Sequence, residues 1–266
     1  MYGIPITKSI TWDASKIINA LITGSRGMGK SWFAMYLTLK LAVLEPPSQI
    51  FAIDFKQSDI SRWSQILPDQ RVAATKQEIF SLLEHYVNLM KERGQFIKNN
   101  AKYGSTANSL GMPLYYLIYD EMGAFASTLD SKEKKLHDTF LSQIVLLGRQ
   151  YNFGLLAIMQ QASVGNSGLN SSIKEQFGLI VHMGDSNQMA YRQTFGENMT
   201  FPNEKLDRGE GLLYLQGLTT NGHVKPFKAK DLSSLDLWQA LQTAFQNQND
   251  KKYLQLMTKN HISRRA

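Results

Sequence analysis

Residues 21–37 read LITGSRGMGKSWFAMYL, an apolar run that three glycines, a lysine and a serine interrupt before it resumes at helical spacing. Glycines this close together are typical of a backbone that turns tightly or approaches another group closely, because glycine has no Cβ and tolerates positive φ. The residues from Gly24 to Ser31 fit the pattern G-x-x-x-x-G-K-[ST], which requires a strand before it and a helix after it. The flanking apolar runs predict both, a strand at 19–23 and a helix at 30–44.

The rest of the chain alternates short apolar runs with helical patterns. Further strands are predicted at 50–54, 114–121, 153–161 and 177–184, an edge element at 209–217, and helices at 76–100 and 131–147. Strands separated by helices of this length predict an α/β fold with a mainly parallel central sheet and helices on both faces. No internal repeat or linker divides the chain, so we predict one large domain over 1–232, followed by a C-terminal helix and basic tail over 233–266.

The glycine-rich loop has the residue types that bind a nucleoside triphosphate. Glycines let backbone N–H groups converge on phosphate oxygens, and the following helix points its positive end at the same anion. Lys30 would reach the β- and γ-phosphates, and the Ser31 hydroxyl would hold Mg²⁺. The predicted cofactors are therefore ATP and Mg²⁺. The predicted nucleotide-binding residues are Gly24, Ser25, Arg26, Gly27, Met28, Gly29, Lys30, Ser31 and Trp32.

Two further strands end in polar residues that suit the same reaction. The strand at 114–121 ends in Asp120 and Glu121, predicted respectively to bind magnesium through water and to polarise the water that attacks the γ-phosphate. An Asp-Glu pair can also simply end a strand; its place after the glycine-rich loop, on the third strand, favours the catalytic interpretation. Gln160, near the end of the next strand, would touch the γ-phosphate and the attacking water, although it could also be a solvated strand end. A glutamate in this position favours ATP hydrolysis over phosphorylation of a small molecule.

Composition narrows the function classes. A net charge of +7 and a pI near 9.4 suit a polyanion such as DNA without requiring one. The absence of cysteine excludes disulfides and thiolate metal sites, and the five histidines lack metal-ligand spacing. The N-terminus lacks the features of a signal peptide, and no stretch approaches the roughly 20 apolar residues of a membrane span. We therefore expect a cytoplasmic or virion-associated protein without a transmembrane segment or direct membrane insertion.

The order of these motifs resembles the FtsK/SpoIIIE–HerA group of DNA-pumping ATPases, from about residue 12 to about residue 230. The segment FAIDFKQSDISRW, with Asp54 and Lys56, is similar to the second-strand segment of that group, and YYLIYDEMGAFA is similar to its acidic strand. LLGRQYNFGLLAIMQQASV resembles the stretch in which an arginine precedes a strand that ends in glutamine. The segments SSIKEQFGLIVHMGDSNQMAYRQTFGE and LDRGEGLLYLQG resemble the fifth strand, its helix and the closing hairpin.

The resemblance implies a RecA-like P-loop NTPase of the ASCE type, with the motor domain over 1–232. It further implies a ring, usually a hexamer, that threads double-stranded DNA and binds ATP between subunits. An arginine from the neighbouring subunit would complete each site; Arg149 is the first candidate and Arg192 the second. For Arg149, helix capping or a solvated surface position is the competing interpretation.

Some features depart from the chromosome translocases of that group. Gln160 is followed by Gln161 and Ala162 where those relatives typically have Arg-Pro, and Phe177 and Gly178 stand near the place of an arginine. Their transmembrane and DNA-reading domains have no counterpart, which suggests a bare motor from a mobile element or a virus. Three functions remain open: DNA transfer with a membrane-channel or relaxosome partner, genome packaging at a capsid vertex, and an ATP-binding assembly factor that does not translocate.

DNA contacts are less defined. The polar segments 101–112 and 162–174 are candidates for DNA contacts, but ordinary surface loops have the same kind of polar composition. The basic stretches 131–137 and 260–266 could dock DNA or a partner, although most such runs are solvated faces. The individual candidates are Lys102, Tyr103, Asn166, Asn170 and Lys174.

Overall fold

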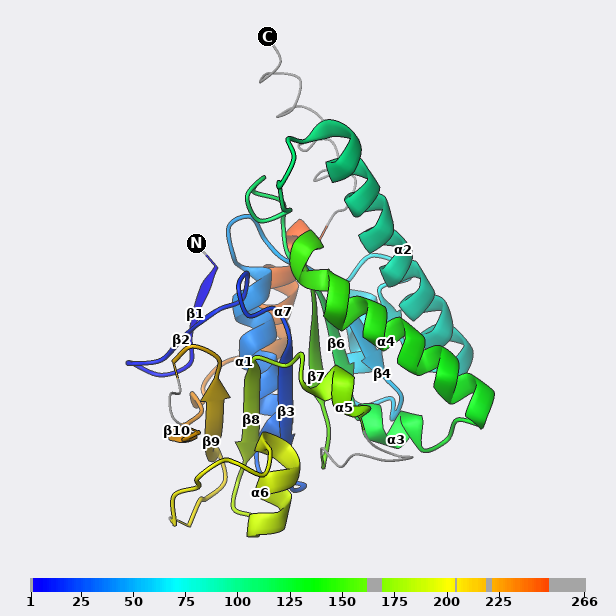
Figure 1. Ribbon diagram of the computed structural model, residues 1–266. Helices are drawn as coiled ribbons and strands as arrows, with labels where there is room; N and C mark the ends of the chain where they lie inside the picture. The colour runs from blue at the N-terminus through cyan, green and yellow to red at the C-terminus, as the bar shows by residue number, and fades with distance from the viewer. Residues whose placement is uncertain (1, 162–168, 204, 219–221, 249–266) are drawn as a thin grey trace.

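The protein is built around a central mixed sheet (Figure 1). The structure is a computed structural model and describes residues 2–161, 169–203, 205–218 and 222–248. In spatial order the eight strands of the sheet are β10 (Lys225–Lys228), β9 (Glu210–Leu215), β8 (Leu179–Met183), β3 (Ala20–Gly24), β7 (Phe153–Ile158), β6 (Tyr115–Asp120), β4 (Gln49–Asp54) and β5 (Val72–Ala73). The pairings from β8 to β5 are parallel and only those of β9 are antiparallel, so the predicted mainly parallel sheet is confirmed.

Helices cover both faces of the sheet, as predicted. One face carries α1 (Lys30–Ala42), α7 (Leu237–Ala244), the 3₁₀ helices η1 (Asp59–Gln65) and η2 (Phe245–Asn247), and a hairpin of β1 (Gly3–Pro5) and β2 (Thr11–Asp13). The other face carries α2 (Lys76–Asn100), α3 (Met122–Ala126), α4 (Ser131–Tyr151), α5 (Ser171–Lys174) and α6 (Gln188–Phe195). In Figure 1, α2 and α4 lie across one face while α1 lies on the opposite one.

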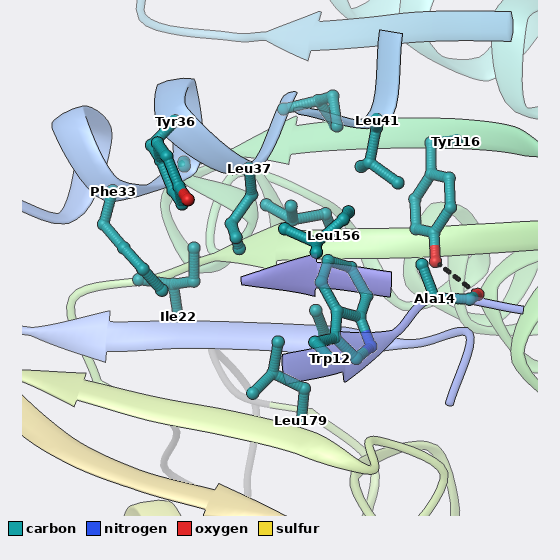
Figure 2. Packing of buried hydrophobic residues seen from close by; sticks show 14 of the residues in the cluster. Trp12, Ala14, Ile22, Phe33, Tyr36, Leu37, Leu41, Tyr116, Leu156 and Leu179 are labelled. Carbon is teal, nitrogen blue, oxygen red and sulfur yellow. Dashed lines mark hydrogen bonds between the residues drawn. The ribbon is translucent and has the colours of Figure 1, made fainter. Parts of the chain in front are cut away.

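Each central strand feeds two hydrophobic cores because successive side chains point to opposite faces. On β3, Leu21 joins the core under α2 and α4, whereas Ile22 joins the core under α1. Strands buried on both faces read as continuous apolar runs, which is why the sequence marked them clearly. Figure 2 shows Leu37 and Leu41 of α1, spaced four residues apart, over the sheet. Burial of each such side chain contributes about 1.5–3 kcal/mol.

The long helices begin where their sequences supply a cap. At α2, Thr75 accepts a hydrogen bond from the Glu78 amide while the Glu78 carboxylate accepts one from the Thr75 amide. Asp130 and Glu133 form the same reciprocal arrangement at α4. Such capping boxes satisfy amides that have no partner within the helix.

The structure corrects the prediction for residues 209–217. They contain β9, but β9 is not at the edge of the sheet, because β10 pairs outside it. β10 reads KPFK and buries only Phe227, so its sequence has little strand periodicity; its proline is compatible with an edge position.

The β1–β2 hairpin was also missed, since each of its strands has only three residues. Its Trp12 is fully buried beside Tyr116, whose hydroxyl donates to the Ala14 carbonyl at 3.0 Å (Figure 2). The hairpin is therefore part of the core on the α1 face.

The order of the strands positions the polar residues. β7 lies between β3, which leads into the glycine-rich loop, and β6, which ends in the acidic pair. Because β3, β4, β6 and β7 are parallel, their carboxyl ends meet at one edge of the sheet. The residues that follow these four strands can therefore form one site.

Candidate nucleotide-binding site

The glycine-rich loop adopts a conformation that its glycines make possible. Gly24 has φ 129°, and a Cβ there would lie 2.2 Å from the Met183 carbonyl oxygen of the neighbouring strand. Gly29 has φ 103° and forms the N-cap of α1 without a side-chain hydrogen bond to the first turn. The first-turn amides of α1 thus have no side-chain cap, and together with the helix dipole they favour an anion in the loop.

Lys30 lies within the loop. Its Nζ donates a hydrogen bond to the Ser25 carbonyl at 2.9 Å, and only 8% of the residue is exposed. Burial lowers the pKa of the Lys30 ammonium, while the nearby charges of Glu121 and Asp120 partly oppose this effect. A partly desolvated ammonium beside carboxylates is stabilised further when an anionic ligand enters.

The acidic side of the site comes from two adjacent strands in register. Asp54 of β4 pairs with Asp120 of β6, and both are buried. Asp54 accepts hydrogen bonds through Oδ2 from the Ser58 hydroxyl and the Ser61 amide, both at 2.9 Å, whereas its buried Oδ1 has no partner among the described residues. Burial raises the pKa of Asp120 to about 6, with further contributions from the negative charges of Glu121 and Asp54.

Glu121 is held in an unusual position. Its backbone has φ 50°, in the left-handed region that is uncommon for a residue with a side chain. Its Oε1 forms an ion pair with Lys56 Nζ at 2.9 Å and accepts a hydrogen bond from Gln160 Nε2 at 3.3 Å. The ends of β4, β6 and β7 are thereby linked through one carboxylate oxygen.

These groups line a single cleft of about 650 Å³. Its lining residues are Arg26, Gly27, Gly29, Lys30, Ser31, Trp32, Lys56, Ser58, Asp120, Glu121, Gln160 and Arg208. The structure thus brings together the lysine, serine, acidic pair and glutamine that the sequence singled out. The other three loop residues shape the loop instead: Gly24 closes β3 against Met183, Ser25 holds Lys30, and Met28 packs beside Gly184.

The oxygen ligands in the cleft fit magnesium only in company with a phosphate. The Ser31 hydroxyl and the Asp120 carboxylate are hard donors of the kind that Mg²⁺ prefers. Within the described residues, no group of three or more acidic, histidine or cysteine side chains could hold a metal by itself. Such a cation would therefore arrive with the nucleotide, whose phosphate oxygens complete its coordination.

The two candidate trans-acting arginines lie outside this cleft. Arg149 is in the last turn of α4, next to the amino end of β7. Gln160 follows the other end of β7, and the strand between them is about 20 Å long. Arg192 is exposed on α6, which follows the carboxyl end of β8. Arg149 therefore cannot reach the cleft of its own chain, and its role as an arginine supplied to a neighbour stays a prediction.

Sequence reasoning omitted Lys56, Ser58 and Arg208 from the site. The sequence did contain a feature that could have identified Lys56 as a site residue, because Lys56 closely follows the second strand in the segment that carries the family resemblance. Arg208 immediately precedes Gly209, whose amide donates to the Met28 carbonyl at 3.1 Å. That contact joins segments about 180 residues apart in the sequence, so no local sequence pattern predicts it.

The DNA-contact candidates are scattered over the surface. Lys102 and Tyr103 are exposed in the loop between α2 and β6. Asn170 caps α5 by accepting from the Ser172 amide, and Lys174 donates to the Gln193 carbonyl. Asn166 and the basic stretch 260–266 lie outside the described residues.

Comparison with known proteins places this fold and cleft in a family. The model of the FtsK/SpoIIIE family matches residues 3–164, which span the glycine-rich loop and both acidic and glutamine-bearing strands. The chain belongs to the FtsK/SpoIIIE family. Its fold is that of the P-loop ATPases of the FtsK/SpoIIIE type, as the sequence resemblance implied.

A curated relative and two solved structures extend the comparison. The FtsK domain-containing protein YdcQ of Bacillus subtilis (strain 168) is 30% identical over 210 residues, 78% of this chain and 43% of that protein. This chain therefore spans less than half the length of YdcQ. The pCW3 conjugation coupling protein TcpA, with ATPgS, superposes with a TM-score of 0.66 at 15% identity over 91% of this chain and 69% of that one. The cytoplasmic domain of the type VII secretion ATPase EccC of Thermomonospora curvata superposes with a TM-score of 0.65 at 19% identity. The match covers 90% of this chain and 29% of that one.

Membership in the FtsK/SpoIIIE family supports ATP hydrolysis as the activity of this domain. Among the residues that the structure describes, every helix falls short of the length or the apolar character that a bilayer-spanning helix requires.

The environment of Asp120 gives a testable pH dependence of stability. Its folded pKa of about 6 exceeds the 3.8 of an unperturbed aspartate, so the folded state binds more protons between these values. The free energy of unfolding therefore falls as the pH rises from about 4 through 6. We expect Asp120→Asn to stabilise the nucleotide-free, magnesium-free protein by roughly 2–3 kcal/mol at pH 8, and by close to nothing at pH 4.

Urea unfolding of both proteins at several pH values measures this difference. Asp69→Asn, at an exposed turn aspartate, is the control and should change stability little at any pH. If Asp120→Asn raised the free energy of unfolding by the same amount at pH 4 and at pH 8, the prediction would be contradicted.

Proposed function

We propose that this FtsK/SpoIIIE domain is an ATP-driven motor that moves double-stranded DNA, encoded by a mobile element and acting in DNA transfer. The observation that carries the proposal is the convergence of the glycine-rich loop, the acidic pair and Gln160 in one cleft. TcpA is a conjugation coupling protein, which agrees with DNA transfer, but at 15% identity the likeness to it concerns the fold alone. The basic charge of +7 supports a polyanionic substrate.

Each side chain has a defined part in hydrolysis. The loop amides and Lys30 bind the β- and γ-phosphates. Ser31 and, through water, Asp120 would hold Mg²⁺, which would neutralise phosphate charge. Glu121 orients and deprotonates the attacking water, and Lys56 and Gln160 fix its carboxylate toward the cleft. An arginine from a neighbouring subunit, Arg149 or Arg192, completes the site in a homo-hexameric ring.

The base of the nucleotide has a place beside the phosphates. A second cleft of about 430 Å³ shares Gly29, Trp32 and Arg208 with the phosphate cleft and continues along residues 228–233. Trp32 is 44% exposed, although tryptophan is mostly buried in folded proteins. Its indole offers a flat apolar face on which a purine stacks.

Tryptophan fluorescence tests this placement. The protein has four tryptophans; Trp12 and Trp63 are buried, and Trp238 lies under Arg62. We expect ATP to change the emission of the wild type, and Trp32→Phe to remove most of that change. Trp32→Ala should raise KM for ATP about 10-fold. Trp238→Phe is the matched control and should keep the ATP-dependent signal; a full signal from Trp32→Phe would place the base elsewhere.

The motor function is tested by measuring ATP turnover with and without duplex DNA, together with the mass of the oligomer with and without nucleotide. We expect duplex DNA to raise turnover several-fold and ATP to favour a ring. Turnover that duplex DNA leaves unchanged, in a protein that still binds ATP, would instead support the assembly-factor function.

A further inference from the structure

A second basic region lies at the opposite end of the sheet from the nucleotide cleft. The ends of α2 and α4 and the loop 101–106 enclose a cleft of about 810 Å³. Lys91, Lys98, Lys102 and Tyr103 line it; we call this region the basic groove. Because α4 leads into the amino end of β7, the groove lies beyond the amino ends of the strands. The end of α2, which contributes to it, is at the top of Figure 1.

The walls of the basic groove carry no compensating negative charge. The sequence has no aspartate or glutamate from 93 to 119, nor from 139 to 174, and these two stretches supply most of the walls. The three lysines are exposed, and within the described part of the chain none of them forms an ion pair. Their charges are therefore available to an external anion.

The basic stretch 131–137 on α4 differs in this respect. There Lys134 lies 3.5 Å from the Asp138 carboxylate, and Glu133 forms an ion pair with Lys76 at 2.8 Å. Its positive charges are interspersed with acidic groups, as on an ordinary solvated helix face. The two regions thus contain lysines in similar number, but acidic side chains lie among those of α4 and not among the residues that line the groove.

The basic groove also has a defined shape. Lys91 and Lys98 are seven residues apart on one side of α2, which separates them by about 10 Å along the helix. Between them, Gly94 leaves room for Tyr151, whose ring carbon would lie only 2.9 Å from a Cβ at that position. Tyr103 is fully exposed at the rim, next to Gly104 with φ 83°.

The helix α2 is fixed to the sheet next to the groove. The Arg93 guanidinium donates to the Pro113 carbonyl at 2.8 Å and to the Tyr151 carbonyl at 2.9 Å, just before β6 and β7 begin. The other ends of these strands carry Asp120, Glu121 and Gln160. A ligand in the groove would therefore lie at one end of the strands whose other end forms the nucleotide cleft.

We propose that the basic groove binds the sugar–phosphate backbone of duplex DNA. The three ammonium groups neutralise successive phosphates, and the Tyr103 hydroxyl donates to a phosphate oxygen at the rim. Only Tyr103 and Tyr151 among the lining residues are aromatic, so the groove lacks the series of stacking rings that favours single strands. This proposal rests on the proposed DNA-translocating function and assigns it a contact surface.

The test replaces charges at the groove and at the control stretch. Lys91→Gln, Lys98→Gln and Lys102→Gln are combined in one variant, and Lys132→Gln, Lys134→Gln and Lys135→Gln in a second that loses the same charge. Binding of a fluorescent, random-sequence duplex is measured against salt concentration, together with basal and DNA-stimulated ATP turnover. We expect the groove variant to lose about 10-fold or more in affinity and about 2–3 units of salt slope, with basal turnover unchanged.

The control variant should bind DNA with nearly wild-type affinity and slope. Equal losses in both variants would show a general charge effect, and a groove variant with wild-type slope would show that DNA binds elsewhere; either result overturns the assignment and leaves the motor function standing. If the wild type itself neither binds nor responds to duplex DNA, both the groove assignment and the proposed DNA function fail. A groove variant that binds single-stranded RNA or an acidic peptide normally but loses duplex DNA supports the assignment.

Discussion

Replacement of Lys30 by alanine is expected to lower ATP turnover by at least about 100-fold. Lys30 is the ammonium inside the glycine-rich loop, buried and within 2.9 Å of the Ser25 carbonyl. In the proposed mechanism it binds the phosphates whose charge grows during γ-phosphoryl transfer, and preorganised charges of this kind account for several kcal/mol of barrier reduction. Steady-state phosphate release and equilibrium binding of ATP measure the loss.

The fold should survive this substitution. Apart from its hydrogen bond to Ser25, the Lys30 side chain contributes little to the stability of the fold, because burial disfavours its charged form and lowers its pKa. Lys40→Ala, in the last turn of the same helix, is the matched control and should retain wild-type turnover. Thermal unfolding followed by circular dichroism separates loss of function from loss of structure. Normal turnover by a folded Lys30→Ala protein would remove the basis for the phosphate-binding role.

Glu121→Gln is expected to slow hydrolysis by about 10²- to 10⁴-fold while ATP binding is kept. Glutamine has the same shape, suits the same backbone position and can still hydrogen-bond to Gln160, but it cannot accept a proton from the attacking water. The variant should therefore accumulate bound ATP. Single-turnover hydrolysis measured beside nucleotide affinity distinguishes a lost chemical step from lost binding.

Glu84→Gln, at an exposed position on α2, is the control for Glu121→Gln and should leave the rate of hydrolysis and the affinity for ATP unchanged. Near-normal hydrolysis by Glu121→Gln would mean that another group activates the water. Loss of ATP binding would instead point to the ion pair with Lys56 as a structural requirement of the cleft.

The sequence signals that led to this candidate site are local. The glycine spacing, the helix that follows it and the apolar runs ending in Asp120 and Gln160 are all contained in short segments, so residue pattern suffices to recognise them. Elements with weak local pattern were missed. The three-residue strands of the β1–β2 hairpin and the single buried residue of β10 carry too little periodicity to stand out.

Electrostatics in the cleft depended on tertiary structure. The pKa of Asp120 follows from burial and from Asp54, a residue 66 positions earlier that comes opposite it only through strand register. The Lys56–Glu121 ion pair and the contact of Gly209 with Met28 likewise join distant segments. The contrast between the lysines of the basic groove, which have no acidic lining residue beside them, and Lys134 of α4, which is paired with Asp138, became visible only once neighbours in space were known.

The sequence by itself determined that the chain forms an α/β sheet with a glycine-rich loop after one strand and an acidic pair at the end of another, because these depend on side-chain periodicity and glycine spacing along the chain. Only the tertiary structure decided that β7 lies between β3 and β6, that Lys56 and Gln160 share one oxygen of Glu121, and that Arg208 borders the cleft. The physical reason is that strand order and side-chain proximity result from packing the described elements against each other in the two large cores on the faces of one sheet.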